Sequence, residues 1–385
     1  MKIIFIINSA FPNYSGGIEN WLYNISNILA DRDLDVTIIS RKSNYLPDYY
    51  PQINSKIKIV RVISISSFKL FKPFVRGYIS LLDMIISSYI MGNKVKSLAF
   101  DASNTSVIAL DSLFCVKSAF HAKKVNPNIN LISSVRGPHG DIYARRFPLF
   151  APFILKSEIR YLKSVDNVWS NGFDTRDSLF LKGVTSDVLF NGIDYYKLIS
   201  SDITNNKSIL NSKFSIISVG TLLPIKGIYE IIDSISLLKE KGYIFDIFFV
   251  GKGDSYKYAK YALGKNVKNQ VHFIGHKNLP VRYIKACKIC VCLSGGGGMS
   301  MAAIEALSTG IPVIGWDTPV YQQFNDIKES RINLVENGNV AKLSLMLENI
   351  YSNYSLFKNK AEENVEYTIR FDWTTIVDDL IFKLN

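Results

Sequence analysis

Two segments in the second half of the chain carry residue types that could bind a phosphorylated ligand. Residues 218–227 contain Lys226 beside a glycine, and residues 294–306 contain four consecutive glycines followed by an apolar helical pattern. Each segment follows an apolar, strand-like run. Together they offer an ammonium group, backbone N–H groups at a helix start and one carboxylate, Glu305. This set suits a nucleoside diphosphate that carries a sugar.

Lys226 and Glu305 each also have an interpretation without a function. An ammonium at the carboxyl end of a strand can neutralise phosphate charge, although a solvated surface lysine is the other interpretation of Lys226. Glu305 lies in an otherwise apolar helical stretch, where a carboxylate is costly unless it is hydrogen-bonded. Ribose hydroxyls would satisfy it, and a partly exposed glutamate is the alternative.

The glycine run predicts a close approach of backbone to ligand, because glycine has no side-chain bulk. The alternative is a flexible loop, but the run lies between a buried strand pattern and an apolar helix pattern. We therefore expect the donor-binding positions of this segment to be Gly297, Gly298, Met299, Ser300, Met301 and Ala302.

The first half of the chain holds two weaker candidates. Gly16 and Gly17 follow the first strand pattern and form another loop of close approach. Arg136 and His139 follow the strand pattern at 131–135 and are framed by glycine and proline. A lone histidine is more often structural, but this framing at a strand exit favours a site.

Composition places the chain among globular proteins, with 48% hydrophobic and 20% charged residues in 385. The formal charge of +12 suits acidic substrates or an anionic membrane surface. We expect no nucleic acid, because there is no dense Lys/Arg block or RNA-binding aromatic signature. Cys287, Cys290 and Cys292 lie in a buried strand pattern without a second ligand pair, so core cysteines are expected rather than a metal site.

Strand and helix patterns alternate along the whole chain, which predicts two α/β domains with doubly wound parallel sheets. The expected strands are 3–7, 36–40, 57–62, 107–110, 131–135, 167–169 and 187–190, then 214–219, 244–250, 271–274, 289–293, 312–315 and 332–335. We place a linker at the polar stretch 200–208. The expected domains are 1–198 and 199–370, with a closing helix at 371–385.

In this order the motifs resemble retaining glycosyltransferase family 4, whose GT-B fold has two Rossmann-like domains facing a cleft. The resemblance covers essentially the whole chain. Each motif is weak alone, and the ordered set is strong. The matching segments are 16–19, 191–194, 219–227, 250–253, 271–275, 305–306 and 310–313.

The resemblance implies roles for matching positions. Lys226 would bind the donor diphosphate, and Glu305, the second glutamate of the family's E-x7-E motif, would hold the ribose. Gly17 would approach the donor from the first domain, and His139 would lie near the sugar. Backbone N–H groups near Met301 and Ala302 would contact phosphate. No metal or other cofactor is expected, because helix dipoles and basic side chains replace it.

Two positions depart from the family pattern. The first glutamate of E-x7-E falls on Gly297, and the arginine usually paired with the lysine falls on Thr221. The leading hypothesis is a glycosyltransferase of bacterial surface-polysaccharide assembly, such as lipopolysaccharide or capsule. A catalytically impaired nucleotide-sugar-binding or partner subunit of the same fold is the alternative. A GT-B epimerase lacks the additional acid/base carboxylates that it needs.

The expected acceptor is a lipid-linked glycan. Apolar-basic segments at 68–76 and 144–150 could lie on an anionic membrane, and packing on their own domain is the alternative. No run of 18 uncharged apolar residues occurs, and the first residues are too short for a signal peptide. We therefore expect a cytoplasmic protein with peripheral membrane contact.

Overall fold

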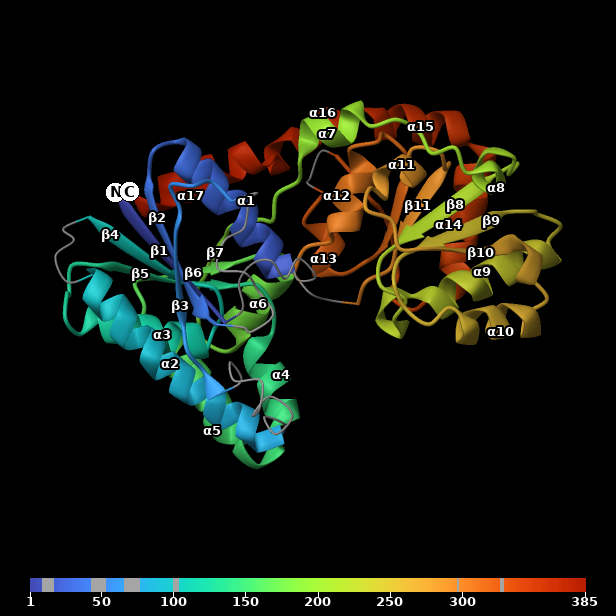
Figure 1. The fold of residues 1–385 in the computed structure, drawn as a ribbon. Coiled ribbons are helices and arrows are strands. Elements are labelled where there is room, and N and C mark those ends of the chain that lie inside the picture. The colour runs from blue at the N-terminus through green and yellow to red at the C-terminus, as the bar shows by residue number, and fades with distance from the viewer. Residues whose placement is uncertain (9–16, 43–52, 66–76, 100–103, 296–297, 326–328) are drawn as a thin grey trace. The chain divides into compact units, whose positions relative to one another are not determined.

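The computed structural model describes residues 1–8, 17–42, 53–65, 77–99, 104–295, 298–325 and 329–385. Two units emerge within this part of the chain. The first comprises Met1–Asn191 together with Trp373–Asn385, and the second comprises Gly192–Asp372. Figure 1 shows the helices and strands of each unit.

The first unit is built on a seven-stranded sheet in the order β3-β2-β1-β4-β5-β6-β7, with every pair parallel. Its core strand β1 is buried on both faces, as expected for a parallel sheet covered by helices. The strands are β1 (Lys2–Ile7), β2 (Asp35–Arg41), β3 (Lys58–Val62), β4 (Thr105–Ala109), β5 (Asn130–Val135), β6 (Asn167–Ser170) and β7 (Asp187–Val188).

Helices cover both faces of this sheet. On one face α1 (Gly17–Asp31) and α17 (Trp373–Leu384) bury their apolar stripes. On the other face α2 (Gly77–Ala99) and α3 (Phe114–Lys123) do so (Figure 1). The segment after β5 and β6 forms α4 (His139–Arg146), the 3-10 helix η3 (Pro148–Phe150), α5 (Ala151–Leu162) and α6 (Phe173–Leu181).

The second unit has a six-stranded parallel sheet in the order β10-β9-β8-β11-β12-β13. The strands are β8 (Ser215–Val219), β9 (Asp246–Val250), β10 (Val271–Gly275), β11 (Ile289–Cys292), β12 (Val313–Trp316) and β13 (Asn333–Val335). The helices are α7 (Tyr195–Ser200), α8 (Lys207–Leu210), η4 (Pro224–Lys226), α9 (Ile228–Glu240), α10 (Tyr256–Gly264), η5 (Lys268–Gln270), α11 (Val281–Ile284), α12 (Met301–Leu307), α13 (Pro319–Gln322), α14 (Val340–Ser352), α15 (Tyr354–Glu362), α16 (Asn364–Tyr367) and η6 (Thr368–Phe371).

The prediction of two doubly wound parallel-sheet domains is confirmed, and each predicted strand has a counterpart within a few residues. The units change after Asn191, so the polar stretch 200–208 lies inside the second unit. The closing helix α17 belongs to the first unit, because Trp373, Ile376 and Leu380 pack into its core. Cys287, Cys290 and Cys292 are buried, the last two in β11.

Candidate active site

The sheet of the second unit changes winding direction between β8 and β11. From β8 the chain moves outward through β9 to β10, and it then returns to the other side of β8 with β11 and moves on to β12 and β13. In doubly wound folds the loops at the carboxyl ends of two such strands form the ligand crevice. Lys226 lies in the loop after β8 and Ser294 in the loop after β11. Lys226 Nζ donates to Ser294 Oγ at 3.0 Å.

Close packing fixes the loop that presents Lys226. Gly227 ends η4 with a φ of 70°, and a Cβ at this position would lie 2.5 Å from the Cβ of Leu293. The Gly295 N–H donates to the Ile225 carbonyl at 3.1 Å, which ties the loop after β11 to that after β8. Only glycine satisfies both the left-handed backbone and this contact at position 227.

Glycines also bring the loops after β8 and β9 together. The Gly220 N–H donates to the Val250 carbonyl at 3.0 Å, and the Leu222 N–H donates to the Lys252 carbonyl at 2.7 Å. A Cβ at Gly251 would overlap the carbonyl oxygen of Gly220. Thr221, between these contacts, is exposed and could meet a ligand only with a hydroxyl and a methyl group.

The Lys226 ammonium is a poorly compensated positive charge. Burial lowers its pKa below the usual value. Within the described residues no carboxylate lies at ion-pair distance from it, and its hydrogen-bond partner is the neutral Ser294 hydroxyl. A cation in such surroundings gains free energy from an incoming anion, because the charge is already partly desolvated.

Ser294 is itself held from below. Its N–H donates to Tyr321 Oη at 2.7 Å, and burial raises the pKa of that tyrosine far above its usual range. Tyr321 lies in α13, the short helix that follows β12, so the hydroxyl that holds Ser294 comes from a third segment after a strand of the same sheet. Sequence reasoning missed Tyr321, because a single tyrosine after a strand carries no spacing signal.

The remaining glycine segment leads into α12. Gly298 has a φ of 82°, and its carbonyl accepts from Gln323 Nε2 at 3.1 Å. Ser300 Oγ caps α12 by accepting from the Ala303 N–H at 3.3 Å. Met299 is buried and Met301 and Ala302 are half-buried at the helix start. Gly297 lies outside the described residues.

Glu305 lies four residues after the start of α12 and is half-buried. Burial raises the pKa of its carboxyl group to about 7. Among the residues that the structure describes, no donor bonds this carboxylate, and only its main-chain carbonyl has a partner, Ser308 Oγ. A carboxyl group in this state would gain hydrogen bonds from a ligand's hydroxyl groups.

In the first unit, Arg136 follows β5 and is 8% exposed. Its guanidinium stacks on the Trp21 ring at 3.8 Å and donates to Ser134 Oγ at 3.1 Å and to Asn191 Oδ1 at 2.8 Å. Burial lowers its pKa to about 9, and no carboxylate in the described part of the chain pairs with it. Asn191 belongs to the motif that the sequence placed at the domain junction.

His139 begins α4, and its Nδ1 atom is buried without a hydrogen-bond partner in the described structure. The next N–H, that of Gly140, donates to Glu158 Oε1 at 3.0 Å. Glu158 is 2% exposed and also accepts from Ser112 Oγ at 2.5 Å and Lys182 Nζ at 3.4 Å. A Cβ at Gly140 would overlap this carboxylate, so the histidine loop needs glycine there.

Glu158 is a second residue that sequence reasoning missed, and here a signal existed. It falls four residues after Ile154 and four before Leu162, both of which are buried on α5. A carboxylate on the apolar stripe of a helix is costly unless it is paired, so the spacing alone marks it as functional or anchoring. Gly17 begins α1, whereas Gly16 lies outside the described residues.

Comparisons with known proteins agree with this geometry. Residues 201–369, which include Lys226, Ser294 and Glu305, match the family model described as Glycosyl transferases group 1. Over 359 residues the chain is 21% identical to an uncharacterized glycosyltransferase of Haemophilus influenzae, covering 91% of each chain.

Solved structures share the fold over the whole length. Anabaena Alr3699/HepE in complex with UDP superimposes with a TM-score of 0.74 at 16% identity, covering 100% of this chain and 99% of that one. WaaG, a glycosyltransferase involved in lipopolysaccharide biosynthesis, gives a TM-score of 0.67 at 15% identity over 98% of both chains. Residues 201–369 are therefore a group 1 glycosyltransferase domain, and the chain as a whole has the GT-B fold of the solved glycosyltransferases.

Two features are absent from the described residues. None of their helices is both long and apolar enough to cross a membrane. They also bring together no group of three or more His, Cys, Asp or Glu side chains that could hold a metal ion.

Proposed function

We propose that this protein is a retaining glycosyltransferase that moves a sugar from a nucleoside diphosphate donor to a hydroxyl group of a lipid-linked glycan. The observation that carries the proposal is the contact of Lys226 with Ser294. It places a desolvated ammonium, without a carboxylate partner in the described residues, where the sheet of the group 1 domain changes direction. Anabaena Alr3699/HepE was solved with UDP-glucose, which makes UDP-sugars the first donors to test.

In the proposed reaction Lys226 stabilises the leaving group, which is the nucleoside diphosphate. As the bond from the anomeric carbon to the diphosphate oxygen breaks, its electron pair stays on the diphosphate, and negative charge grows there. The ammonium stabilises that charge at close range, and burial has already removed part of its own hydration. The same carbon bonds to the acceptor oxygen with its configuration retained, and the acceptor proton passes to a leaving-group oxygen. Main-chain N–H groups around Gly298–Ala302 would assist.

Glu305 would bind the donor ribose. Its carboxyl group has no donor among the described residues and sits in an apolar site. Ribose hydroxyls would supply the missing hydrogen bonds and favour the ionised form. We also propose that Arg136 and His139 contact substrate. They would present a cation and an imidazole at the end of β5 in the first unit.

The acceptor and the pathway are inferred from charge and likeness. The net charge of +12 suits an anionic lipid-linked substrate, and WaaG acts in lipopolysaccharide biosynthesis. We place the reaction in bacterial surface-polysaccharide assembly, in the cytoplasm at the inner face of the membrane. The expected apolar-basic segment at 144–150 spans the end of α4 and η3, while 68–76 lies outside the described residues.

A transfer assay tests the proposal. The purified chain is incubated with UDP-, GDP-, ADP- and dTDP-sugars and an alkyl-diphosphate-linked sugar, and the product anomer is assigned by proton NMR coupling. Transfer with the donor's own anomeric configuration supports the proposal, and an inverted product contradicts the retaining mechanism.

A specific observation keeps a second candidate in view. Thr221 is exposed where the family carries a second cation, which leaves Lys226 alone on the diphosphate. Donor binding without hydrolysis or transfer, across a broad panel of acceptors, would favour a nucleotide-sugar-binding partner subunit over an enzyme.

A further inference from the structure

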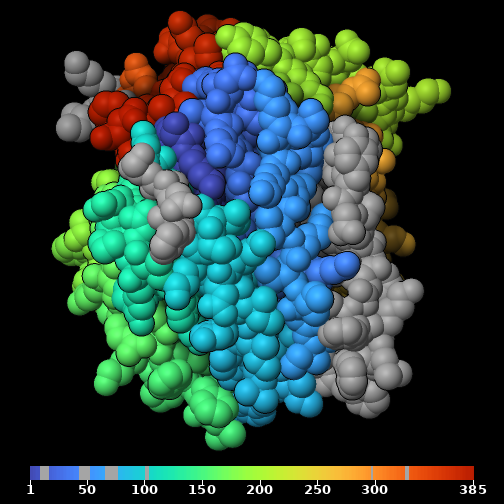
Figure 2. Space-filling view, turned by 60° about the vertical axis from the view of Figure 1, so that its left-hand side comes forward, coloured from blue at the N-terminus to red at the C-terminus, as the bar shows by residue number. Residues whose placement is uncertain are grey.

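A hollow of about 540 Å³ lies in the first unit between α2, α3 and the η3–α5 segment. Its walls are aromatic and aliphatic, with the hydroxyls of Ser157 and two tyrosines and the ammonium of Lys117 as the polar groups. Its apolar and aromatic lining includes Tyr78, Leu82, Ile85, Leu113, Phe150 and Phe153. Figure 2 shows this face, with α2 exposed in cyan and green residues of the α4–α5 region near its lower end.

The hollow has an apolar floor and an apolar rim. The floor belongs to a buried apolar cluster, from which Leu81, Leu113, Phe114 and Ile154 line the hollow. On the rim Leu82 is 56% exposed and Phe153 is 70% exposed. Contiguous exposed apolar surface of this kind marks a site of interaction with a protein, a ligand or a membrane.

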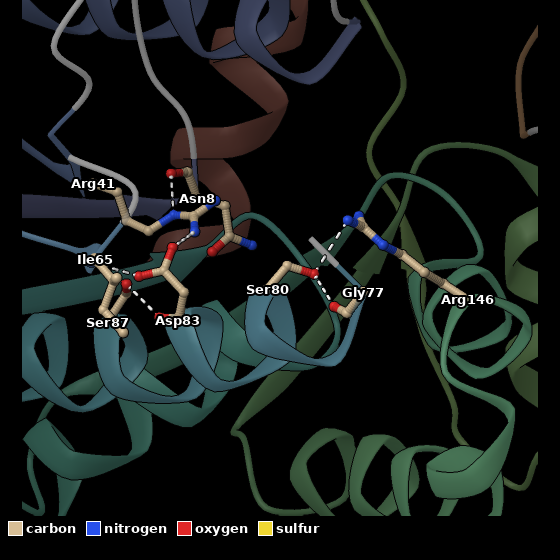
Figure 3. Close-up of polar contacts among 8 residues, drawn as sticks. All are labelled: Asn8, Arg41, Ile65, Gly77, Ser80, Asp83, Ser87 and Arg146. Atoms are coloured by element: carbon tan, nitrogen blue, oxygen red, sulfur yellow. Dashed lines mark hydrogen bonds and ion pairs between the residues drawn. The ribbon is translucent and has the colours of Figure 1, made fainter. Parts of the chain in front are cut away.

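The first turn of α2 contains Tyr78, which lines the hollow, and Figure 3 shows the polar contacts of its neighbours Gly77 and Ser80. Arg146 donates to Ser80 Oγ at 3.2 Å, and Ser80 donates to the Gly77 carbonyl at 2.6 Å. The Tyr78 ring lies 5.8 Å from the rings of both Phe147 and Phe150. This turn therefore lies beside both an aromatic wall and an exposed guanidinium.

The carboxylates on the surrounding helices are neutralised by ion pairs. They are Asp83, Asp141 and Glu158, and the first pairs with Arg41 and the other two with Lys182. Within the described residues no carboxylate lies at ion-pair distance from Lys117, which lines the hollow, or from Arg160, whose guanidinium lies over the ring of the lining residue Tyr161. An apolar hollow bordered by unpaired cations is complementary to an amphiphile with an anionic head group.

The hollow adjoins the sheet edge that carries the candidate histidine. Leu113 lines it just before α3, in the segment that follows β4, and Ser157 lines it next to Glu158 on α5. Glu158 holds both Ser112 and the Gly140 N–H beside His139. At the other side, Arg41 at the end of β2 anchors α2 by bonding the Asn8 carbonyl at 3.1 Å and pairing with Asp83 at 3.4 Å.

We propose that this hollow holds the hydrocarbon chain of the phosphate-bearing lipid that carries the acceptor glycan. The inference rests on the proposed function, because it assigns the lipid to the acceptor of that reaction. The hydrocarbon chain of the lipid packs between Leu82, Phe150 and Phe153, and its phosphate lies among the bordering cations. A nucleotide or a free sugar does not suit these walls, which offer few hydrogen-bonding groups.

Binding of simple alkyl phosphates tests the site without any transfer reaction. Calorimetry below the critical micelle concentration compares octyl, decyl and dodecyl phosphate with dodecyl maltoside and dodecyltrimethylammonium. Affinity should rise roughly tenfold for each added pair of buried methylenes, from about 0.8 kcal/mol per methylene. The anionic head group should bind more tightly than the neutral one, and the cationic one least. Affinity independent of chain length, or highest for the cation, overturns the inference.

A matched pair of variants locates the binding. Leu82→Asp places a carboxylate in the hollow at a helix position that is 56% exposed, so folding should survive. Leu345→Asp makes the same change at a helix position of the second unit that is also 56% exposed. Dodecyl phosphate should bind Leu82→Asp at least tenfold more weakly and Leu345→Asp as tightly as wild type. Equal binding by Leu82→Asp and wild type contradicts the inference.

Donor assays separate this inference from the proposed function. Leu82→Asp should raise KM for an alkyl-diphosphate-linked acceptor and leave the thermal shift by donor unchanged. If wild type transfers sugar and Leu82→Asp keeps the wild-type KM, the function stands and the lipid site falls. If alkyl phosphates bind as described but no donor shifts or reacts with wild type, the proposed function falls, and with it the assignment of the lipid to an acceptor.

Discussion

Lys226 combines partial burial, a lowered pKa and a neutral hydrogen-bond partner, which are the properties of a cation that awaits an anion. Lys226→Ala should therefore lower kcat by about 100-fold or more, the usual cost of removing one preorganised group that stabilises transition-state charge. Lys213→Ala is the matched control, because Lys213 is exposed and precedes β8 at the opposite end of the same strand. Steady-state kinetics with the preferred donor check both. A wild-type rate in Lys226→Ala contradicts the assignment.

Glu305 makes a prediction about pH and stability. Its pKa rises from 4.5 to about 7 in the folded chain, so folding favours the protonated form. Wild type should therefore lose stability as pH rises from about 5 to 8, on the order of 1–3 kcal/mol, relative to Glu305→Gln, which cannot ionise. Urea unfolding at pH 5.5 and pH 8 measures the difference. Parallel pH profiles for the two proteins would show that this carboxyl group is not shifted.

At the scale of elements, the close contact between the loops after β8 and β9 shapes the Lys226 site. Gly251→Ala would push a methyl group into the Gly220 carbonyl and should destabilise the fold by about 1–3 kcal/mol, a usual cost of overpacking. Gly264→Ala, at the end of α10 with open space around it, should be neutral or slightly stabilising. Thermal unfolding of both variants checks this. Equal stabilities would mean that the two loops yield without cost.

The sequence predicts the helices and strands better than it predicts the contacts between them. The stretch 301–307 was expected to be helical, and α12 spans Met301–Leu307. The buried strands are apolar runs in the sequence, so their positions along the chain and the fold class can be predicted from it. Tyr321 under Ser294 and the hollow between α2, α3 and α5 depend on residues far apart in the chain. Local patterns hold no information about such tertiary contacts. The sequence therefore predicts Lys226 and Glu305 as candidate residues, but it does not predict the contact of Tyr321 with Ser294.

At the scale of the molecule, the chain returns to its first unit at the end, and α17 is part of that unit's core. Leu380 is fully buried there, and Leu380→Ala should lower the free energy of unfolding by about 2–5 kcal/mol. Phe382→Ala on the same helix, at a side chain that is 79% exposed, should change it by less than about 0.5 kcal/mol. Chemical denaturation compares the two. Similar effects would mean that α17 does not contribute its buried stripe to the core.

The central claim is that a nucleoside diphosphate sugar binds the intact chain at Lys226. A thermal-shift screen of wild type and Lys226→Ala against UDP-, GDP-, ADP- and dTDP-sugars tests it most directly. At least one donor should raise the Tm of wild type, and the shift should be largely lost in Lys226→Ala, because ligand binding to the folded state adds to its stability. A wild type that no donor stabilises, or a shift of equal size in Lys226→Ala, would contradict the claim.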